Sequence, residues 1–170
     1  IDRLKELGVT VLNIDDEFSK DVVLNEIVPF ERRRQAMVAI EQSGKAVKSG
    51  KEMDITKLRE IVGDIVDDIL FEKDTLISLM DIRSYDTQMF AHAVSVCIMA
   101  VVIGKSMRLK PDQLNVLASG ALLHDIGTVK LPKELLRKRE PFTPEETEVF
   151  QTHTNEGFNL LRSNNDISLV

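Results

Sequence analysis

The sequence predicts an all-α helical bundle that follows a short helix–strand remnant of a preceding domain. Two patterns favour helices: apolar residues recur at three- and four-residue spacing, and prolines or capping residues precede several of these segments. The composition agrees, because 43% apolar and 29% charged residues are typical of a globular chain with a buried core. The length of 170 residues suits one ordinary domain with a small fragment attached.

The first residues differ from the rest of the chain. Leu4 and Leu7 fit one helical turn, and the β-branched run at 9–14 predicts a strand. A lone helical turn and strand cannot cover their apolar faces, so residues 1–20 are interpreted as the tail of a preceding small regulatory domain. Residues 21–72 are interpreted as a helical connector, and residues 73–170 as the main domain.

Helices are expected from residue 24 onward. A long helix is predicted over 24–49, with Pro29 in its early part. Asp54 caps an amphipathic helix that runs to residue 69. The sequence predicts further helices at 76–82, 86–107, 111–124, 132–138 and 143–162. The helix at 86–107 is apolar nearly all round, which places it at the centre of the bundle.

The later helices carry clear start signals. Pro111 stands at a first-turn position, where the missing proline N–H is not needed, and Pro132 opens a short helix that runs to residue 138. Thr143 and Glu146 form a capping box around Pro144. The helix that begins there is expected to continue without a break to about residue 162.

Charge and cysteine content limit the expected partners and compartment. There are 22 basic and 28 acidic residues, a net charge of −6, and no basic stripe interleaved with aromatics, so DNA or RNA is not an expected partner. The single cysteine, Cys97, lies in an apolar run, which predicts a buried thiol and fits a reducing cytoplasm. The longest apolar stretch, at 91–104, is shorter than the about 20 residues that a bilayer crossing needs, so no membrane segment is expected.

The chain has three histidines, and two of them lie on apolar helix faces. His92 lies within the most apolar helix, where a buried imidazole is either a satisfied core residue or a metal ligand. His153 follows the apolar stripe of the last helix and points inward. Gly157 lies one turn later on the same face, and close approach of another helix is one reason to accept a glycine there.

The third histidine has a carboxylate beside it. His124 and Asp125 end an apolar helix, and Gly127 follows, which lets the backbone leave sharply so that both side chains can face one point. A neutral nitrogen and an anionic oxygen side by side are suitable ligands for a catalytic divalent metal. Three separate helices thus each offer one inward imidazole, which favours a shared metal site at His92, His124, Asp125 and His153.

These local strings resemble the HD superfamily and, within it, the HD-GYP branch. The resemblance is carried by His92 and by residues 121–127 (ALLHDIG), 131–136 (LPKELL), 142–146 (FTPEE) and 152–157 (THTNEG). It covers about residues 73–170, which are therefore identified as an HD-GYP-like domain. The domain is expected to be incomplete at its C-terminus, because the family's later paired histidines, final metal-binding aspartate and Gly-Tyr-Pro loop are not found before Val170.

The resemblance implies a bundle that holds two divalent ions, iron or manganese, and hydrolyses cyclic-di-GMP. The products would be pGpG or GMP, in bacterial second-messenger signalling in the cytoplasm. Carried over residue by residue, His92, His124, Asp125 and His153 are metal ligands, His124 and Asp125 are catalytic, and Asp125 bridges two ions. Such ions activate water and neutralise the charge that develops on the phosphodiester.

Two residues depart from the family's pattern. Where the family has lysine three positions after the aspartate, this chain has Thr128, with Lys130 nearby; both are candidate substrate-binding residues. Trinuclear members carry glutamate one turn before the first histidine, where this chain has the uncharged Gln88. The departures leave open a degenerate HD domain that binds a nucleotide or a partner protein without turnover, and a phosphohydrolase acting on other nucleotides. A second copy of the chain and a signalling protein are candidate partners.

Overall fold

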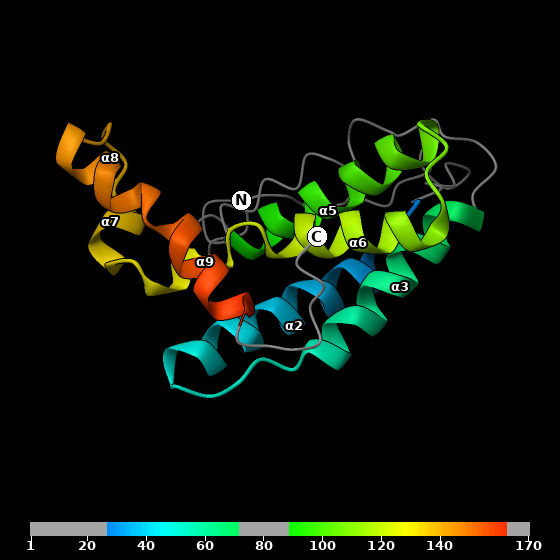
Figure 1. Ribbon diagram of the computed structural model, residues 1–170, viewed down its shortest axis with the longest axis horizontal. Helices are drawn as coiled ribbons and strands as arrows, with labels where there is room; N and C mark the ends of the chain where they lie inside the picture. Colours follow the sequence, from blue (N-terminus) through cyan, green and yellow to red (C-terminus); the bar gives the residue numbers. More distant parts are fainter. Residues whose placement is uncertain (1–26, 72–88, 163–170) are drawn as a thin grey trace, which may run out of the picture.

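The computed structural model describes residues 27–71 and 89–162. Every regular element in these two ranges is a helix, which confirms the all-α expectation (Figure 1). The elements are α2 (Phe30–Lys48), α3 (Ile55–Phe71), α5 (Met89–Ser106), α6 (Pro111–Leu123), η1 (Ile126–Lys130), α7 (Lys133–Arg137), α8 (Pro144–Gln151) and α9 (His153–Arg162). The remnant expected at 1–20, the helix expected at 76–82 and Gln88 lie outside the described residues.

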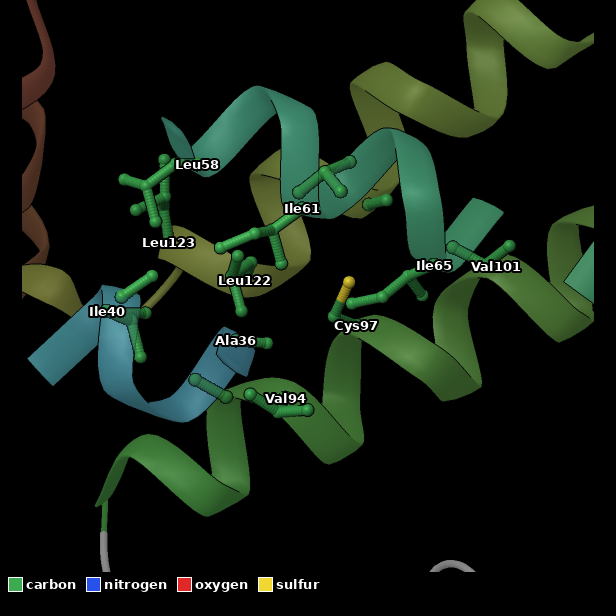
Figure 2. Close-up of a cluster of buried hydrophobic side chains, with 14 of the residues drawn as sticks. Ala36, Ile40, Leu58, Ile61, Ile65, Val94, Cys97, Val101, Leu122 and Leu123 are labelled. Carbon is green, nitrogen blue, oxygen red and sulfur yellow. The ribbon is translucent and has the colours of Figure 1, made fainter. Parts of the chain in front are cut away.

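Four helices share one core. The α5 helix packs along α6, α3 packs against both α6 and α2, and α2 also contacts α5. Figure 2 shows Ile40 of α2, Ile65 of α3, Cys97 of α5 and Leu122 of α6 meeting in this interior, where each is almost completely buried. The segment interpreted as a connector therefore supplies two of the four core helices, α2 and α3. The domain boundary at residue 72 stays a prediction.

The α3 helix shows how the sequence pattern places the core. Its buried residues follow the expected three- and four-residue spacing: Ile55, Leu58, Ile61, Val62, Ile65, Val66 and Ile69. The start of α2 differs from the expectation, because the helix begins at Phe30 and not at residue 24. Pro29 takes the N-cap position in an extended conformation, with φ −54° and ψ 142°. Proline cannot occupy a helix interior without losing a hydrogen bond, so the helix starts after it.

The start signals of α6 and α8 are confirmed, and Pro132 is the N-cap residue of α7, which begins at Lys133. Pro111 is the first residue of α6. At the start of α8, the Thr143 hydroxyl accepts a hydrogen bond from the Glu146 amide at 3.3 Å, and the Glu146 carboxylate accepts one from the Thr143 amide at 2.8 Å. Each side chain thus accepts the backbone N–H of the other residue. This is the capping box that the sequence indicated.

The helix expected over 143–162 is in fact two helices, α8 and α9, separated at Thr152. Three consecutive side chains at the junction donate hydrogen bonds to the last carbonyl groups of α8: Thr152 to Val149 at 2.7 Å, His153 to Phe150 at 2.6 Å, and Thr154 to Gln151 at 3.0 Å. Carbonyl groups at a helix end lack partners within the helix, so these side chains stabilise an ending there. The expectation of an unbroken helix is wrong for this reason.

The α7–α8 lobe, residues 131–152, projects from the bundle. Figure 1 shows α7 and α8 at one end of the molecule, with α9 between them and the bundle. None of the residues of α8 is buried, whereas α9 packs closely on η1. The lobe is therefore joined to the bundle chiefly through α9, and His153, the first residue of α9, lies at that joint.

Two further expectations concern Cys97 and membrane-spanning helices. Cys97 has no exposed surface, and burial raises the pKa of its thiol to about 12, so the prediction of a buried core thiol is confirmed. Across residues 27–71 and 89–162, no helix combines the length and the apolar character that crossing a bilayer requires.

Candidate metal centre

The turn between α6 and η1 places His124 and Asp125 side by side. The α6 helix ends at Leu123, His124 is its C-cap residue, and Asp125 precedes η1. The Nε2 atom of His124 lies 3.0 Å from Oδ2 of Asp125. On the other side of the ring, Nδ1 of His124 lies 2.8 Å from the carbonyl oxygen of Ala121. The helix end therefore fixes which edge of the imidazole faces the carboxylate.

The junction between α8 and α9 presents His153 in the same way. Its Nδ1 atom lies 2.6 Å from the carbonyl oxygen of Phe150, three residues earlier, and its Nε2 atom lies 3.5 Å from Oδ1 of Asp125. The side chain is 14% exposed, so it is the most enclosed of the imidazoles paired with Asp125. Residues 29 positions apart in sequence thus repeat one arrangement, in which a carbonyl holds Nδ1 and Nε2 faces Asp125.

His92 completes the cluster from α5. Its ring centroid lies 5.4 Å from that of His124. One ligand atom from each of His92, His124 and Asp125 lies within 4.8 Å of the other two. The structure therefore brings His92, His124, Asp125 and His153 together around one carboxylate, as the sequence predicted for their positions; their roles as ligands stay a prediction.

His92 is exposed, which corrects the expectation that it is buried. The core face of α5 includes Ala93, Val94, Cys97 and Val101, and the exposed His92 lies outside this buried set. Because α5 is apolar nearly all round, its composition did not distinguish the inward side from the outward side.

The chemistry of the cluster fits a divalent cation. A carbonyl oxygen can only accept a hydrogen bond, so Nδ1 of both His124 and His153 carries the hydrogen. With Nδ1 held by a carbonyl, the Nε2 atom of each ring faces the carboxylate of Asp125. A proton or a metal ion between Nε2 and the carboxylate would satisfy both groups. Imidazole nitrogen with carboxylate oxygen is a donor set that binds first-row divalent metals, and the carbonyl bonds are the support that such histidines usually have.

The two oxygens of Asp125 face different imidazoles. Oδ2 is the nearer to His124, and Oδ1 is the nearer to His153. One carboxylate with a nitrogen donor beside each oxygen can be shared between two ions. This geometry supports the expectation that Asp125 bridges.

Gly127 and Gly157 set the distance between η1 and α9. A Cβ atom on Gly127 would lie 2.0 Å from the carbonyl oxygen of His153 and 2.4 Å from the amide nitrogen of Gly157. Gly157 is therefore at a close approach, as its position on the helix suggested. The sharp-turn explanation for Gly127 is wrong, because among the described glycines the positive φ belongs to Gly50. Gly127 is needed because a side chain would push His153 away from Asp125.

The two candidate substrate-binding residues lie in different environments. Thr128 is 3% exposed, and its hydroxyl donates a hydrogen bond of 2.6 Å to the carbonyl oxygen of Asp125. The Thr128 amide donates to the same oxygen at 3.0 Å. Lys130 is exposed at the end of η1. A substrate contact stays a prediction for both residues, and exposure favours Lys130.

Sequence reasoning did not find the groups that orient the histidines. The carbonyls of Ala121 and Phe150 are backbone groups, which every residue has, so no residue type marks them. The ring of Phe150 also packs against His153, with centroids 4.9 Å apart. An aromatic residue three positions before the histidine is the one signal that the sequence contained.

The α-helical bundle thus brings three imidazoles and one carboxylate together, and His92, His124 and Asp125 among them could hold a metal ion. The family model described as HD domain matches residues 75–167. The chain belongs to the HD-domain family, and similarity to three curated relatives confirms the expected HD-GYP branch.

The relatives are all named as cyclic di-GMP phosphodiesterases. PA4108 of Pseudomonas aeruginosa is 23% identical over 136 residues, which is 80% of this chain and 33% of that protein. The enzyme of Thermotoga maritima is 31% identical over 102 residues, 59% of this chain and 27% of that protein. PdeB of Borreliella burgdorferi is 31% identical over 74 residues, 44% of this chain and 20% of that protein. The chain thus spans a third or less of the length of these relatives, and no solved structure matches it significantly.

Proposed function

We propose that this chain is the metal-binding part of a phosphodiesterase that hydrolyses cyclic-di-GMP to pGpG or GMP in bacterial second-messenger signalling. The observation that carries the proposal is the carboxylate of Asp125, whose two oxygens face the Nε2 atoms of His124 and His153. The names of the three relatives support the substrate class.

Two divalent ions, manganese or iron, would use the four side chains unequally. His92, His124 and Asp125 offer three ligand atoms close together, whereas His153 and Asp125 offer two. Judged from the described residues, the first position would therefore bind its ion more tightly than the second. When bound, the ions would lower the pKa of water and neutralise charge on the phosphodiester.

The protein's own groups keep the site ready for this chemistry. The carbonyls of Ala121 and Phe150 hold the two rings with Nε2 toward Asp125. Thr128 fixes the backbone of Asp125 through two hydrogen bonds to one oxygen. Exposure of His92 and His124 leaves one side of the cluster open, so that a dinucleotide can reach it.

Lys130 is our candidate for the contact to a substrate phosphate. It is exposed and lies five residues after Asp125, at the end of η1. A lysine ammonium group binds phosphate oxygens as a point charge. We also propose that the protein acts in the cytoplasm. Its proposed partner is a second copy of the chain or a signalling protein.

One observation favours a second function, that of an HD domain which binds a nucleotide without turnover. Thr128 stands where the family has lysine, and it is buried with its hydroxyl engaged by Asp125. A contact that the family makes to the substrate is then absent from this position. Binding and turnover must be measured separately to distinguish the two functions.

The test uses the whole phosphodiesterase of which this chain is proposed to be the metal-binding part, since residues 1–170 alone are expected to show little or no activity. The purified enzyme is incubated with manganese or ferrous iron and cyclic-di-GMP, and chromatography follows the linear product. We expect metal-dependent product that a chelator abolishes and that His124→Ala reduces to the no-enzyme level, because this change removes a ligand beside Asp125. Glu134→Gln, an exposed position on α7, is the matched control and should retain activity. Binding of cyclic-di-GMP without product would favour the second function, and neither binding nor product would contradict both.

A further inference from the structure

We infer that Phe150 is a positioning residue for His153, acting through both its backbone carbonyl and its aromatic ring. The two groups contact different parts of the same imidazole. The consequence for metal binding rests on the proposed function, but the orientation of the ring is a property of the metal-free protein.

The carbonyl of Phe150 is available because the helix breaks after α8. In a continuous helix this oxygen would accept the amide of Thr154. Here α8 ends at Gln151, and Nδ1 of His153 lies 2.6 Å from the Phe150 carbonyl oxygen. The same bond ends the helix and turns Nε2 toward Asp125, 3.5 Å away.

The ring of Phe150 also packs against the imidazole of His153. The centroids of the two rings are 4.9 Å apart, with their planes tilted by 50°. Phe150 also packs against Phe142, with ring centroids 5.3 Å apart. Tilted aromatic pairs at such distances are favourable, so the row Phe142–Phe150–His153 resists rotation of the imidazole.

Further contacts within the α7–α8 lobe hold the segment that carries Phe142. Lys138 pairs with Glu146, and Glu146 also accepts the amide of Thr143 at 2.8 Å. These contacts hold the segment before α8 against the start of that helix, next to Phe142. Because α8 has no buried residue of its own, its order depends on such local bonds and on its contact with α9. Phe150 contacts both Phe142 of this lobe and His153 of the site.

The experiment compares Phe150→Leu with Phe150→Tyr, which keeps the ring, and with Val149→Ala, a neighbour that is 44% exposed. Imidazole nitrogen NMR of the metal-free protein reports the tautomer and environment of His153, and manganese binding is measured by calorimetry. We expect Phe150→Leu to shift the His153 signals and to weaken the second manganese ion about tenfold, the lower end of the effect for groups that orient metal ligands. Phe150→Tyr and Val149→Ala should match the unmodified protein in both measurements.

The outcomes separate the inference from the proposed function. If Phe150→Leu leaves the His153 signals and manganese affinity unchanged, or if Val149→Ala changes them equally, the inference is overturned while the proposed function stands. If the unmodified protein binds no manganese, the proposed function is overturned. In that case the His153 signals alone decide the inference: a shift in Phe150→Leu with none in Phe150→Tyr supports it, and any other pattern overturns it.

Discussion

Replacing Asp125 by asparagine should remove hydrolysis to the no-enzyme level and weaken manganese binding more than about 100-fold, the upper end of the loss seen for residues that merely orient a ligand. The amide has the shape of the carboxylate but no negative charge. Both imidazoles that lie within 3.0 and 3.5 Å of Asp125 would then face a neutral group, so neither ion position keeps its anionic ligand.

The matched control for this change is Asp112→Asn. Asp112 is exposed in the first turn of α6, the helix that ends at the site, so the variant makes the same chemical change on the same element. We expect its manganese affinity and turnover to stay within about twofold of the unmodified protein, since surface substitutions away from special features have small effects. Retained hydrolysis in Asp125→Asn, with normal manganese binding, would show that the reaction uses other groups.

The Gly127→Ala change should produce the largest loss of stability among single-methyl additions near the site. The new Cβ would lie 2.0 Å from the carbonyl oxygen of His153, a backbone atom that cannot rotate away. Overpacking costs about 1–3 kcal/mol, and more where backbone must move. Because backbone must move here, we expect the upper value of about 3 kcal/mol. Each kilocalorie lowers Tm by about 2–4 °C in a domain of this size, so Tm should fall by roughly 6–12 °C.

Gly157→Ala adds the same methyl group from the opposite side of the contact. Its nearest neighbour would be the Gly127 amide nitrogen at 3.4 Å, which is an ordinary contact distance. Since alanine favours a helix over glycine by about 1 kcal/mol, this variant should be as stable as the unmodified protein or slightly more so. Equal destabilisation by both changes would contradict the asymmetry of the contact, and no destabilisation by Gly127→Ala would contradict the close approach itself.

The positions of the site residues could be predicted because residue type and spacing carried the information. A histidine next to an aspartate at the end of an apolar helix, followed by glycine, indicated His124 and Asp125, and the structure places both at the end of α6. The amphipathic spacing of α3 likewise gave its buried face. In each case the local pattern and the tertiary packing favour the same arrangement, which is why sequence reasoning succeeded.

The parts that could not be predicted depend on groups that carry no sequence signal. The outward position of His92 was missed because α5 is apolar on every side, so no stripe indicated its core face. The break at Thr152 was missed because three side chains must bond back to α8 together, which propensity does not describe. The role of α2 and α3 as core helices follows from tertiary contacts alone, because an amphipathic helix does not reveal which neighbour covers it.

The most direct test of the account is anomalous diffraction at the manganese absorption edge from crystals of the protein grown with manganese. We expect the strongest anomalous peak within bonding distance, about 2.0–2.2 Å, of Nε2 of His124 and the carboxylate of Asp125. A weaker second peak should lie between Asp125 and His153, because fewer described ligand atoms face that position. Peaks elsewhere in the molecule, with none beside Asp125, would contradict the claim that these side chains form a metal centre.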